Sequence, residues 1–409
     1  MTDPVTRLRQ DALAIFRAAL DALEPRALAR RAAERLIPTG RETRLIAIGK
    51  AAVTMGRGVA DARALAGALV VTKDGHGEDA FHAGHPVPDE RSQAAGRAVL
   101  DAAAAATDLL VVALSGGASA LAVAPAWGLT LAEKIAATRA VAASGADIRA
   151  LNTVRKHLSA LKGGRLALAS RAEIIALVLS DVLGDDLATI GSGPVHPDPT
   201  TFAEALAIAR AADGVPDRVL ELLAAGARGE LPETPKAPLA HVTTEILAGP
   251  ANLVGVAADA AAARGYSVTI ETGIAADAGA VGALLAARAS ALAAKPGRHA
   301  HVAGGEPVVR LPRAPGRGGR AQHAALAAAA TGLPPGAVVL AVGSDGTDGP
   351  TADAGGLVDA GTAARAGGSL AESLGRFDAG SALAAAGDLV TTGPTGTNLC
   401  DLFVVLTGS

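Results

Sequence analysis

The chain has 409 residues, half of them hydrophobic, which is enough apolar material for two or three domains with cores of their own. Its 37 basic and 40 acidic residues give a formal net charge of −3, and its aromatic residues are five Phe, one Trp and one Tyr. This composition excludes a disordered chain. It also argues against nucleic acids or membranes as partners, because such surfaces need an excess of positive charge or aromatic platforms for stacking. The single Cys400 excludes an intrachain disulfide, and no apolar run approaches the ~20 residues that cross a bilayer, so we expect a cytoplasmic protein.

The predicted elements follow one repeating order along the chain. The segment up to about residue 36 predicts one or two helices, broken at Pro25, that cover a sheet edge or face. Short apolar runs then end in glycine or serine turns at residues 45–48, 109–114, 174–179, 246–247 and 338–342. Alanine-rich stretches of helical length lie at residues 60–68, 94–106, 256–264 and 278–294. Strands that alternate with helices predict an α/β fold with mostly parallel sheets covered on both faces.

A proline-rich polar stretch at residues 226–241 is the best candidate for a linker. We therefore expect one domain over residues 1–235 and a smaller one over residues 236–409. A second proline and glycine cluster, at residues 311–319, is short and charged, which is typical of a functional loop.

Two turns that directly follow predicted strands have the residues of an anion site. Ligands of an open parallel sheet bind beyond the carboxyl ends of its strands. Lys50 follows Gly49 at the end of the run 45–48, where a positive charge suits phosphate, although a surface lysine at the start of a helix is equally compatible. Two glycines and two hydroxyls follow the run 109–114, and they resemble a phosphate cradle more than a plain strand-to-helix turn. These residues are Ser115, Gly116, Gly117 and Ser119.

Further positive charge is concentrated at residues 152–165. Asn152, Arg155 and Lys156 lie on successive helical turns, which favours an anionic ligand nearby, although a solvated amphipathic helix would also explain much of the pattern. His85 lies in a loop whose backbone is restricted by two prolines, and the polar side chains of this loop remain available to a ligand.

Carboxylates gather at other strand ends. Asp186 follows the run 174–179, and Asp345 and Asp348 follow the run 338–342, where they could hold Mg²⁺ through substrate phosphates or serve as a general base. Helix capping is the competing explanation for an aspartate in such a turn. Glu306 and Arg320 lie in glycine-rich turns, and a guanidinium can hold a carboxylate or phosphoryl group through two hydrogen bonds. Lysine, arginine, backbone amides and carboxylates together indicate a small-molecule phosphotransferase.

The motifs resemble those of class II glycerate 2-kinases, the MOFRL family, some of whose members are labelled hydroxypyruvate reductase. The matching segments appear in family order and span most of the chain. They are IGKAA at Ile48, GHPVPDERS at Gly84, LSGGASAL at Leu114, LNTVRKHLSALKGGRLA at Leu151, SDVLGDD at Ser180, SGPVHPDPTT at Ser192, GGEP at Gly304, GGRAQ at Gly318, GSDGTDGPTADAGG at Gly343 and GPTGTN at Gly393.

The resemblance implies a large Rossmann-like N-terminal glycerate kinase domain, a smaller C-terminal MOFRL domain and an active site in the cleft between them. The implied reaction is ATP-dependent phosphorylation of the 2-hydroxyl of D-glycerate, with Mg²⁺ as cofactor. The family's catalytic lysine and arginine match Lys50 and Arg320. Ala321 and His323 stand where the family usually has Asn and Glu, which leaves a related sugar acid as an alternative substrate and hydroxypyruvate reduction as an alternative reaction.

Combining the residue patterns with the resemblance gives the expected site. Catalytic roles are expected of Lys50, Arg320 and Asp186, and nucleotide binding of Gly49, Ser115, Gly116, Gly117 and Ser119. Substrate binding is expected of His85, Asn152, Arg155, Lys156 and Arg320, and metal binding of Asp186, Glu306, Asp345 and Asp348. The expected partners are ATP and a small hydroxy acid, with a homodimer left open.

Overall fold

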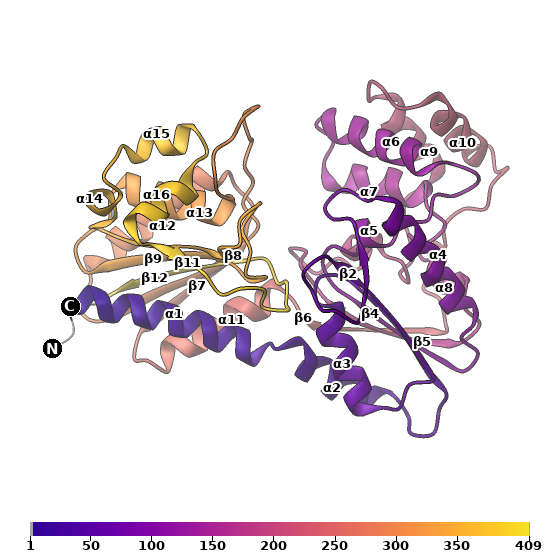
Figure 1. The fold of residues 1–409 in the computed structure, drawn as a ribbon, viewed down its shortest axis with the longest axis horizontal. Coiled ribbons are helices and arrows are strands. Elements are labelled where there is room, and N and C mark those ends of the chain that lie inside the picture. Colours follow the sequence, from indigo (N-terminus) through magenta and orange to yellow (C-terminus); the bar gives the residue numbers. More distant parts are fainter. Residues whose placement is uncertain (1–2, 409) are drawn as a thin grey trace. The chain divides into compact units, whose positions relative to one another are not determined.

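The computed structural model describes residues 3–408 and divides the chain into two compact units, each with its own six-stranded sheet (Figure 1). The first, here the Lys50 unit, comprises Pro25–Ser180 and Asp185–Leu247. The second, here the Arg320 unit, comprises Met1–Glu24, Asp181–Gly184 and Ala248–Ser409. These units differ from the predicted division after residue 235, because the N-terminal residues group with the C-terminal half and residues 236–247 remain in the Lys50 unit.

The sheet of the Lys50 unit is built around two buried neighbouring strands. Its spatial order is β3 (Phe81–Ala83), β2 (Gly67–Lys73), β1 (Thr43–Ile48), β4 (Leu109–Leu114), β5 (Glu173–Leu179) and β6 (Val242–Ala248). The pairs β2–β3, β1–β2, β1–β4 and β4–β5 are parallel. Ile48 pairs with Leu114, so β1 and β4 end side by side and their following turns must meet.

The helices of the Lys50 unit cover this sheet and add a helical layer with its own core. They are α2 (Pro25–Leu36), α3 (Ala52–Ala62), α4 (Glu90–Ala104), α5 (Ala118–Leu121), α6 (Leu131–Ala143), α7 (Ile148–His157), α8 (Arg165–Leu168), α9 (Phe202–Arg210) and α10 (Asp217–Ala227). Helices α6, α7, α9 and α10 pack around the buried ring of Phe202, which meets the edge of the His157 ring at 4.7 Å between centroids. This second core fixes α6 and α7, the two helices that later supply basic side chains.

The sheet of the Arg320 unit is mixed. Its spatial order is β11 (Leu389–Val390), β10 (Gly355–Asp359), β9 (Ala337–Gly343), β12 (Asp401–Thr407), β8 (His299–Gly305) and β7 (Ser267–Ile274). Strands β7 and β8 are parallel, whereas β12 runs antiparallel to both β8 and β9. The last strand of the chain thus enters the middle of the sheet, which adds more antiparallel pairing than the strand–helix alternation predicts.

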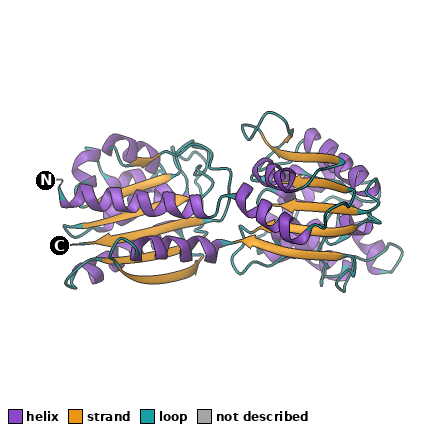
Figure 2. Ribbon diagram, turned by 90° about the horizontal axis from the view of Figure 1, so that it is seen from below, coloured by secondary structure: helices purple, strands orange, loops and turns teal. Residues whose placement is uncertain are grey.

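Helices cover both faces of this second sheet. Helices α1 (Pro4–Ala22) and α11 (Pro250–Ala262) lie on one face, and Figure 2 shows helices lying across the strands of each sheet. The other face bears α12 (Ala278–Ala293), α13 (Arg320–Thr331), α14 (Thr362–Ala366), α15 (Leu370–Gly375) and α16 (Ala379–Ala386). Leu8, Ala12, Ile15 and Ala19 of α1 are buried at helical spacing, which confirms that an N-terminal helix covers a sheet.

The α/β class, with two sheets flanked by helices, is confirmed, and all five predicted strands are present. The predicted helix 60–68 is wrong in its position. Only its first residues belong to α3, because residues 67–73 pair with β1 as β2, and this non-local pairing outweighs the helix propensity of alanine. Among the described residues, no helix is long and apolar enough to span a membrane.

Candidate active site

The turns after β1 and β4 interlock, as their adjacent strands require. The Lys50 amide donates to the carbonyl oxygen of Gly116 (2.9 Å), and the Ala51 amide donates to Ser115 Oγ (3.0 Å). Gly49 has φ +134°, and a Cβ at this position would lie 2.1 Å from Ser115 Oγ. Only glycine therefore allows this approach. The structure thus brings Lys50 together with the predicted glycine and serine cradle.

A third segment reaches the same turn. Gly117 has φ +90°, and a Cβ built there would lie 3.3 Å from His85 Nε2 and 3.5 Å from Lys50 Cγ. His85 and Lys50 therefore flank the Gly117 turn, although His85 is far from both in sequence.

Ser119 connects this turn to two other predicted segments. Its Oγ lies 2.7 Å from Ser192 Oγ, and the Ser192 hydroxyl donates to Asn152 Oδ1 (3.3 Å). Ser192 is buried and has φ +62°, a rare conformation for a residue with a side chain. The sequence places Ser192 inside a matching motif but does not single it out as a site residue. Its position between Ser119 and Asn152 shows that it helps to fix both.

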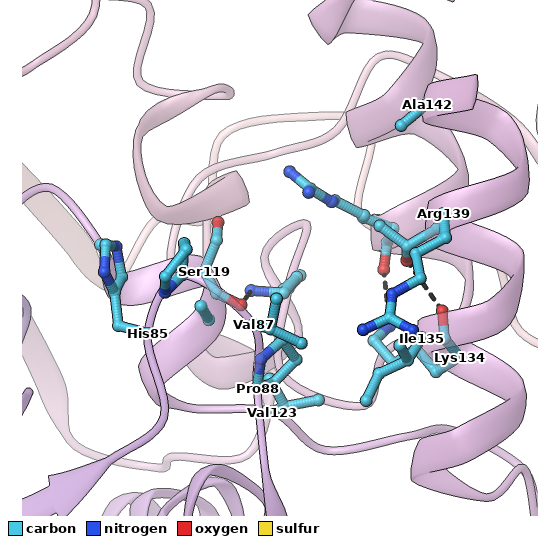
Figure 3. Close-up of a pocket in the computed structure, with 15 residues that line it drawn as sticks. His85, Val87, Pro88, Ser119, Val123, Lys134, Ile135, Arg139 and Ala142 are labelled. Atoms are coloured by element: carbon cyan, nitrogen blue, oxygen red, sulfur yellow. Dashed lines mark hydrogen bonds between the residues drawn. The ribbon is translucent and has the colours of Figure 1, made fainter. Parts of the chain in front are cut away.

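Next to these residues is a cavity of about 350 Å³ within the Lys50 unit. Figure 3 shows side chains of α6 along one wall and His85, Val87, Pro88 and Ser119 on the other. Four of the lining residues are basic and, within residues 3–408, none is acidic. The basic residues are Lys134, Arg139, Arg155 and Lys162. Arg155 was predicted to bind substrate, whereas Lys134, Arg139 and Lys162 were not.

Two of these cations are buried without an acidic neighbour in the cavity lining. Lys134 is 5% exposed, and its Nζ donates to the carbonyl oxygens of Arg155 (3.0 Å) and Leu158 (2.8 Å). Lys162 is 1% exposed, and its Nζ donates to the Ser119 carbonyl oxygen (3.0 Å). Burial, reinforced by the charge of Arg155, lowers the pKa of Lys162 to about 7, and burial also lowers the pKa values of Lys134 and Arg155. A bound anion in the cavity would offset the cost of burying these side chains in their charged forms.

Lys156 and Asp186 have structural partners. Lys156 is buried in an ion pair with Asp198 (Nζ to Oδ1, 3.2 Å) and does not line the cavity. Asp186 accepts hydrogen bonds from the Ala188 amide (3.0 Å) and the Thr189 hydroxyl (2.7 Å). Both of its carboxylate oxygens therefore stabilise the turn at residues 186–189. The predicted binding role of Lys156 and catalytic or metal role of Asp186 remain predictions.

In the Arg320 unit, a guanidinium lies between two carboxylates. Arg320 donates from Nε to Asp401 Oδ2 (2.8 Å) and from Nη1 to Glu306 Oε1 (2.7 Å). Burial lowers the pKa of Arg320, but the two carboxylates outweigh that effect and raise it overall. Burial raises the pKa of Asp401 to about 7 despite Arg320. Asp401 is absent from the sequence-based site, and the sign of it in the sequence is its place at the start of an apolar run, which the structure shows as the buried strand β12.

Asp348 caps the N-terminus of α13, the helix that begins at Arg320. Its carboxylate oxygens accept hydrogen bonds from the backbone amides of Ala321 (3.1 Å) and Gln322 (2.7 Å), which have no acceptor within the helix because they lie in its first turn. Burial raises the pKa of Asp348 to about 6. Asp345 instead accepts from the Thr347 amide (3.0 Å) within its own loop.

The predicted metal ligands do not form a dedicated metal cage. In the described part of the chain, no group of three or more His, Cys, Asp or Glu side chains is placed to hold a metal ion. Asp186 belongs to the Lys50 unit, whereas Glu306, Asp345 and Asp348 belong to the Arg320 unit. This donor set fits Mg²⁺ only in the form common for nucleotides, with one or two carboxylates and most ligands from phosphates and water.

The two atypical residues after Arg320 are buried. Ala321 is 0% exposed, and His323 stacks on Phe377 with the ring centroids 5.0 Å apart. Burial lowers the pKa of His323, which therefore packs as a neutral ring. Neither residue extends the polar cluster around Arg320.

Comparison with known proteins gives consistent matches in both halves of the chain. Residues 11–224 match the family model described as a domain of unknown function (DUF4147), and residues 299–401 match the MOFRL family. A D-glycerate 2-kinase of Thermotoga maritima is 36% identical over 99% of this chain and 100% of its own length. A protein of Agrobacterium vitis with the provisional name hydroxypyruvate reductase is 39% identical over 98% of this chain and 94% of its own. The crystal structure of glycerate kinase from Thermotoga maritima aligns with a TM-score of 0.87 at 35% identity, covering 98% of this chain and 100% of that chain.

Proposed function

The chain belongs to the MOFRL family together with glycerate kinases, and from this premise we propose that it transfers a phosphoryl group from ATP to the 2-hydroxyl of D-glycerate. The products are 2-phospho-D-glycerate and ADP. The observation that carries this proposal is the cavity beside the glycine turns that hold Lys50, whose lining in the described part of the chain has four basic side chains and no acidic one. Phosphoryl transfer needs little more from a protein than positioned reactants and compensated negative charge.

Lys50 neutralises the transferring phosphoryl group in this proposal. Its backbone is fixed to Gly116, and Gly49 and Gly117 allow three segments to approach closely around it. A charge that is positioned before the reaction needs no reorganisation when negative charge shifts in the transition state.

Arg320 holds the acid or a phosphoryl oxygen. Asp401 binds its Nε and Nη2, and Glu306 binds its Nη1, so the two carboxylates orient the guanidinium as positioning residues. Arg320 is 31% exposed at its side chain, so a ligand can still reach it.

Mg²⁺ would be supplied with the nucleotide and would neutralise its phosphate oxygens. In the Arg320 unit, Glu306 and Asp345 are the predicted carboxylates that are not used to cap α13, so they are the candidates to contact it there. We also propose that the protein works in the cytoplasm on small molecules alone.

The test is an ADP-release assay on the purified full-length chain with ATP and Mg²⁺. D-glycerate is expected to give ADP and a product phosphorylated at C2, as located by NMR, and chelation of Mg²⁺ is expected to abolish turnover. L-glycerate and four-carbon sugar acids test whether Ala321 and His323 accompany a different acid specificity. Absence of ADP release with every acid would refute the kinase, and NADH oxidation with hydroxypyruvate would favour the reductase.

A further inference from the structure

The cavity of the Lys50 unit is a poor match for D-glycerate alone. D-glycerate is a three-carbon monoanion, whereas the cavity has about 350 Å³ and four basic side chains. Pockets of this volume hold ligands much larger than such an acid. A single carboxylate would leave part of the positive charge of Arg139 and Arg155 uncompensated, and an unpaired charge is costly in a partly buried site.

We infer that this cavity binds the nucleoside triphosphate, with its polyphosphate against Arg139, Arg155 and Lys162 and its base against the apolar wall around Val87 and Ile135. This inference rests on the proposed function, which makes ATP a substrate. It assigns Arg155 and His85 to the nucleotide, although the sequence predicts that they bind the acid, and it adds Arg139 and Lys162 to the site.

The polyphosphate end is defined by charge. ATP carries several negative charges along its phosphates, and Arg139, Arg155 and Lys162 come from α6, α7 and the turn after α7 to line one cavity. Lys134 on α6 lines the same cavity, and its Nζ is held by two backbone carbonyls. Lys162 Nζ lies at the Ser119 carbonyl, next to the Gly117 turn where Lys50 is found. The phosphates would therefore extend toward Lys50.

The cavity lining also includes a group of apolar side chains. They are Pro86, Val87, Pro88, Val123 and Ile135, and Val87 remains 48% exposed although it is a large hydrophobic residue. A planar base that covers these side chains would remove apolar surface from water, at roughly 25 cal/mol per Å². No aromatic side chain of the described residues lines the cavity apart from the imidazole of His85, so aliphatic contacts must replace stacking.

The experiment is equilibrium binding by calorimetry on the full-length protein, with ADP, inorganic tripolyphosphate and D-glycerate as separate probes. Arg139→Gln and Arg155→Gln are each expected to weaken ADP and tripolyphosphate about tenfold, the loss of one charged hydrogen bond, with less than about a twofold change in KM for D-glycerate. Val87→Ala is expected to weaken ADP about threefold and to leave tripolyphosphate unchanged, since only the base meets that wall.

Arg149→Gln is the matched control, because Arg149 is exposed on the same helix as Arg155 and does not line the cavity. It is expected to change none of the three affinities. Thermal unfolding of every variant identifies any loss of folding. Arg139 is exposed, so Arg139→Gln is expected to fold even if Arg155→Gln is destabilised, and it then tests the inference alone.

The inference is overturned if the arginine variants raise KM for D-glycerate while ADP binds as in the wild type, or if neither ligand is affected. Both results are compatible with a wild-type protein that phosphorylates D-glycerate. Failure of the proposed kinase function would give a different result: the wild type would bind ADP in this cavity but would release no ADP from ATP with any acid.

Discussion

Replacing Asp401 by Asn removes a carboxylate that the fold holds buried at the start of β12, against the guanidinium of Arg320. Burial outweighs the attraction of Arg320 and raises the pKa of Asp401 from 3.8 to about 7. A raised carboxyl pKa means that the folded protein binds this proton more tightly than the unfolded chain. Its stabilising effect is fully present below about pH 4 and is lost as the pH rises to about 7.

The expected magnitude follows from that shift. One pKa unit corresponds to 1.36 kcal/mol, so the full rise from 3.8 to about 7 costs about 4 kcal/mol at neutral pH. Asn resembles the protonated carboxyl group at every pH. The free energy of unfolding of Asp401→Asn, minus that of the wild type, should therefore increase by about 3 kcal/mol between about pH 5 and about pH 8.

The assay is urea unfolding of both proteins without Mg²⁺ at several pH values. The chain has one Trp and one Tyr, and they lie in different units: Trp127 in the Lys50 unit and Tyr266 in the Arg320 unit. The tyrosine signal thus reports on the unit that contains Asp401, and the Trp127 signal is an internal control. Taking the difference between variant and wild type cancels the titration of other groups, such as His301 and His323, whose pKa values burial lowers.

A difference between the two proteins that stays constant with pH would refute this reasoning. It would show that Asp401 remains ionised at about pH 5 and that Arg320 compensates fully for its burial. A pH-dependent difference in the Trp127 transition alone would also contradict it, because the effect would then not belong to the Arg320 unit.

Three further predictions concern both units. Lys50→Ala should lower kcat at least a hundredfold in the ADP-release assay while thermal unfolding stays near that of the wild type, because its side chain acts on the reacting phosphate; retained turnover would remove Lys50 from the catalytic residues. Gly117→Ala should cost about 1–2 kcal/mol in urea unfolding and lower kcat, because φ is +90° and the new Cβ would press on His85; an unchanged midpoint and kcat would contradict this. Asp348→Ala should lower the stability of the Arg320 unit by about 1–2 kcal/mol through loss of the cap of α13, with Asp348→Asn losing less; equal losses would show that the cap is not the cause.

The residue pattern predicted the central strands and the turns that follow them. Buried runs such as 109–114 can be recognised locally, since they are apolar, short and bounded by glycine or serine. Adjacent parallel strands place their following turns together, so the approach of Lys50 to the Gly116–Gly117 turn was also predictable. The resemblance to glycerate kinases, read from the same motifs, was confirmed by relatives matching nearly the whole chain.

The sequence by itself therefore determined the α/β class, the family and the residues around Lys50, because local pattern and motif encode them. Only the tertiary structure decided which charges are buried and what they meet. Lys156 and Lys162 look alike in sequence, yet Lys156 is paired with Asp198, whereas Lys162 lines a cavity to which residues 3–408 contribute no acidic side chain. Asp401 gained its partner Arg320, 81 residues away, through the insertion of β12 between β8 and β9. Burial and partnership depend on contacts between distant segments, and these contacts set the pKa values that local sequence cannot show.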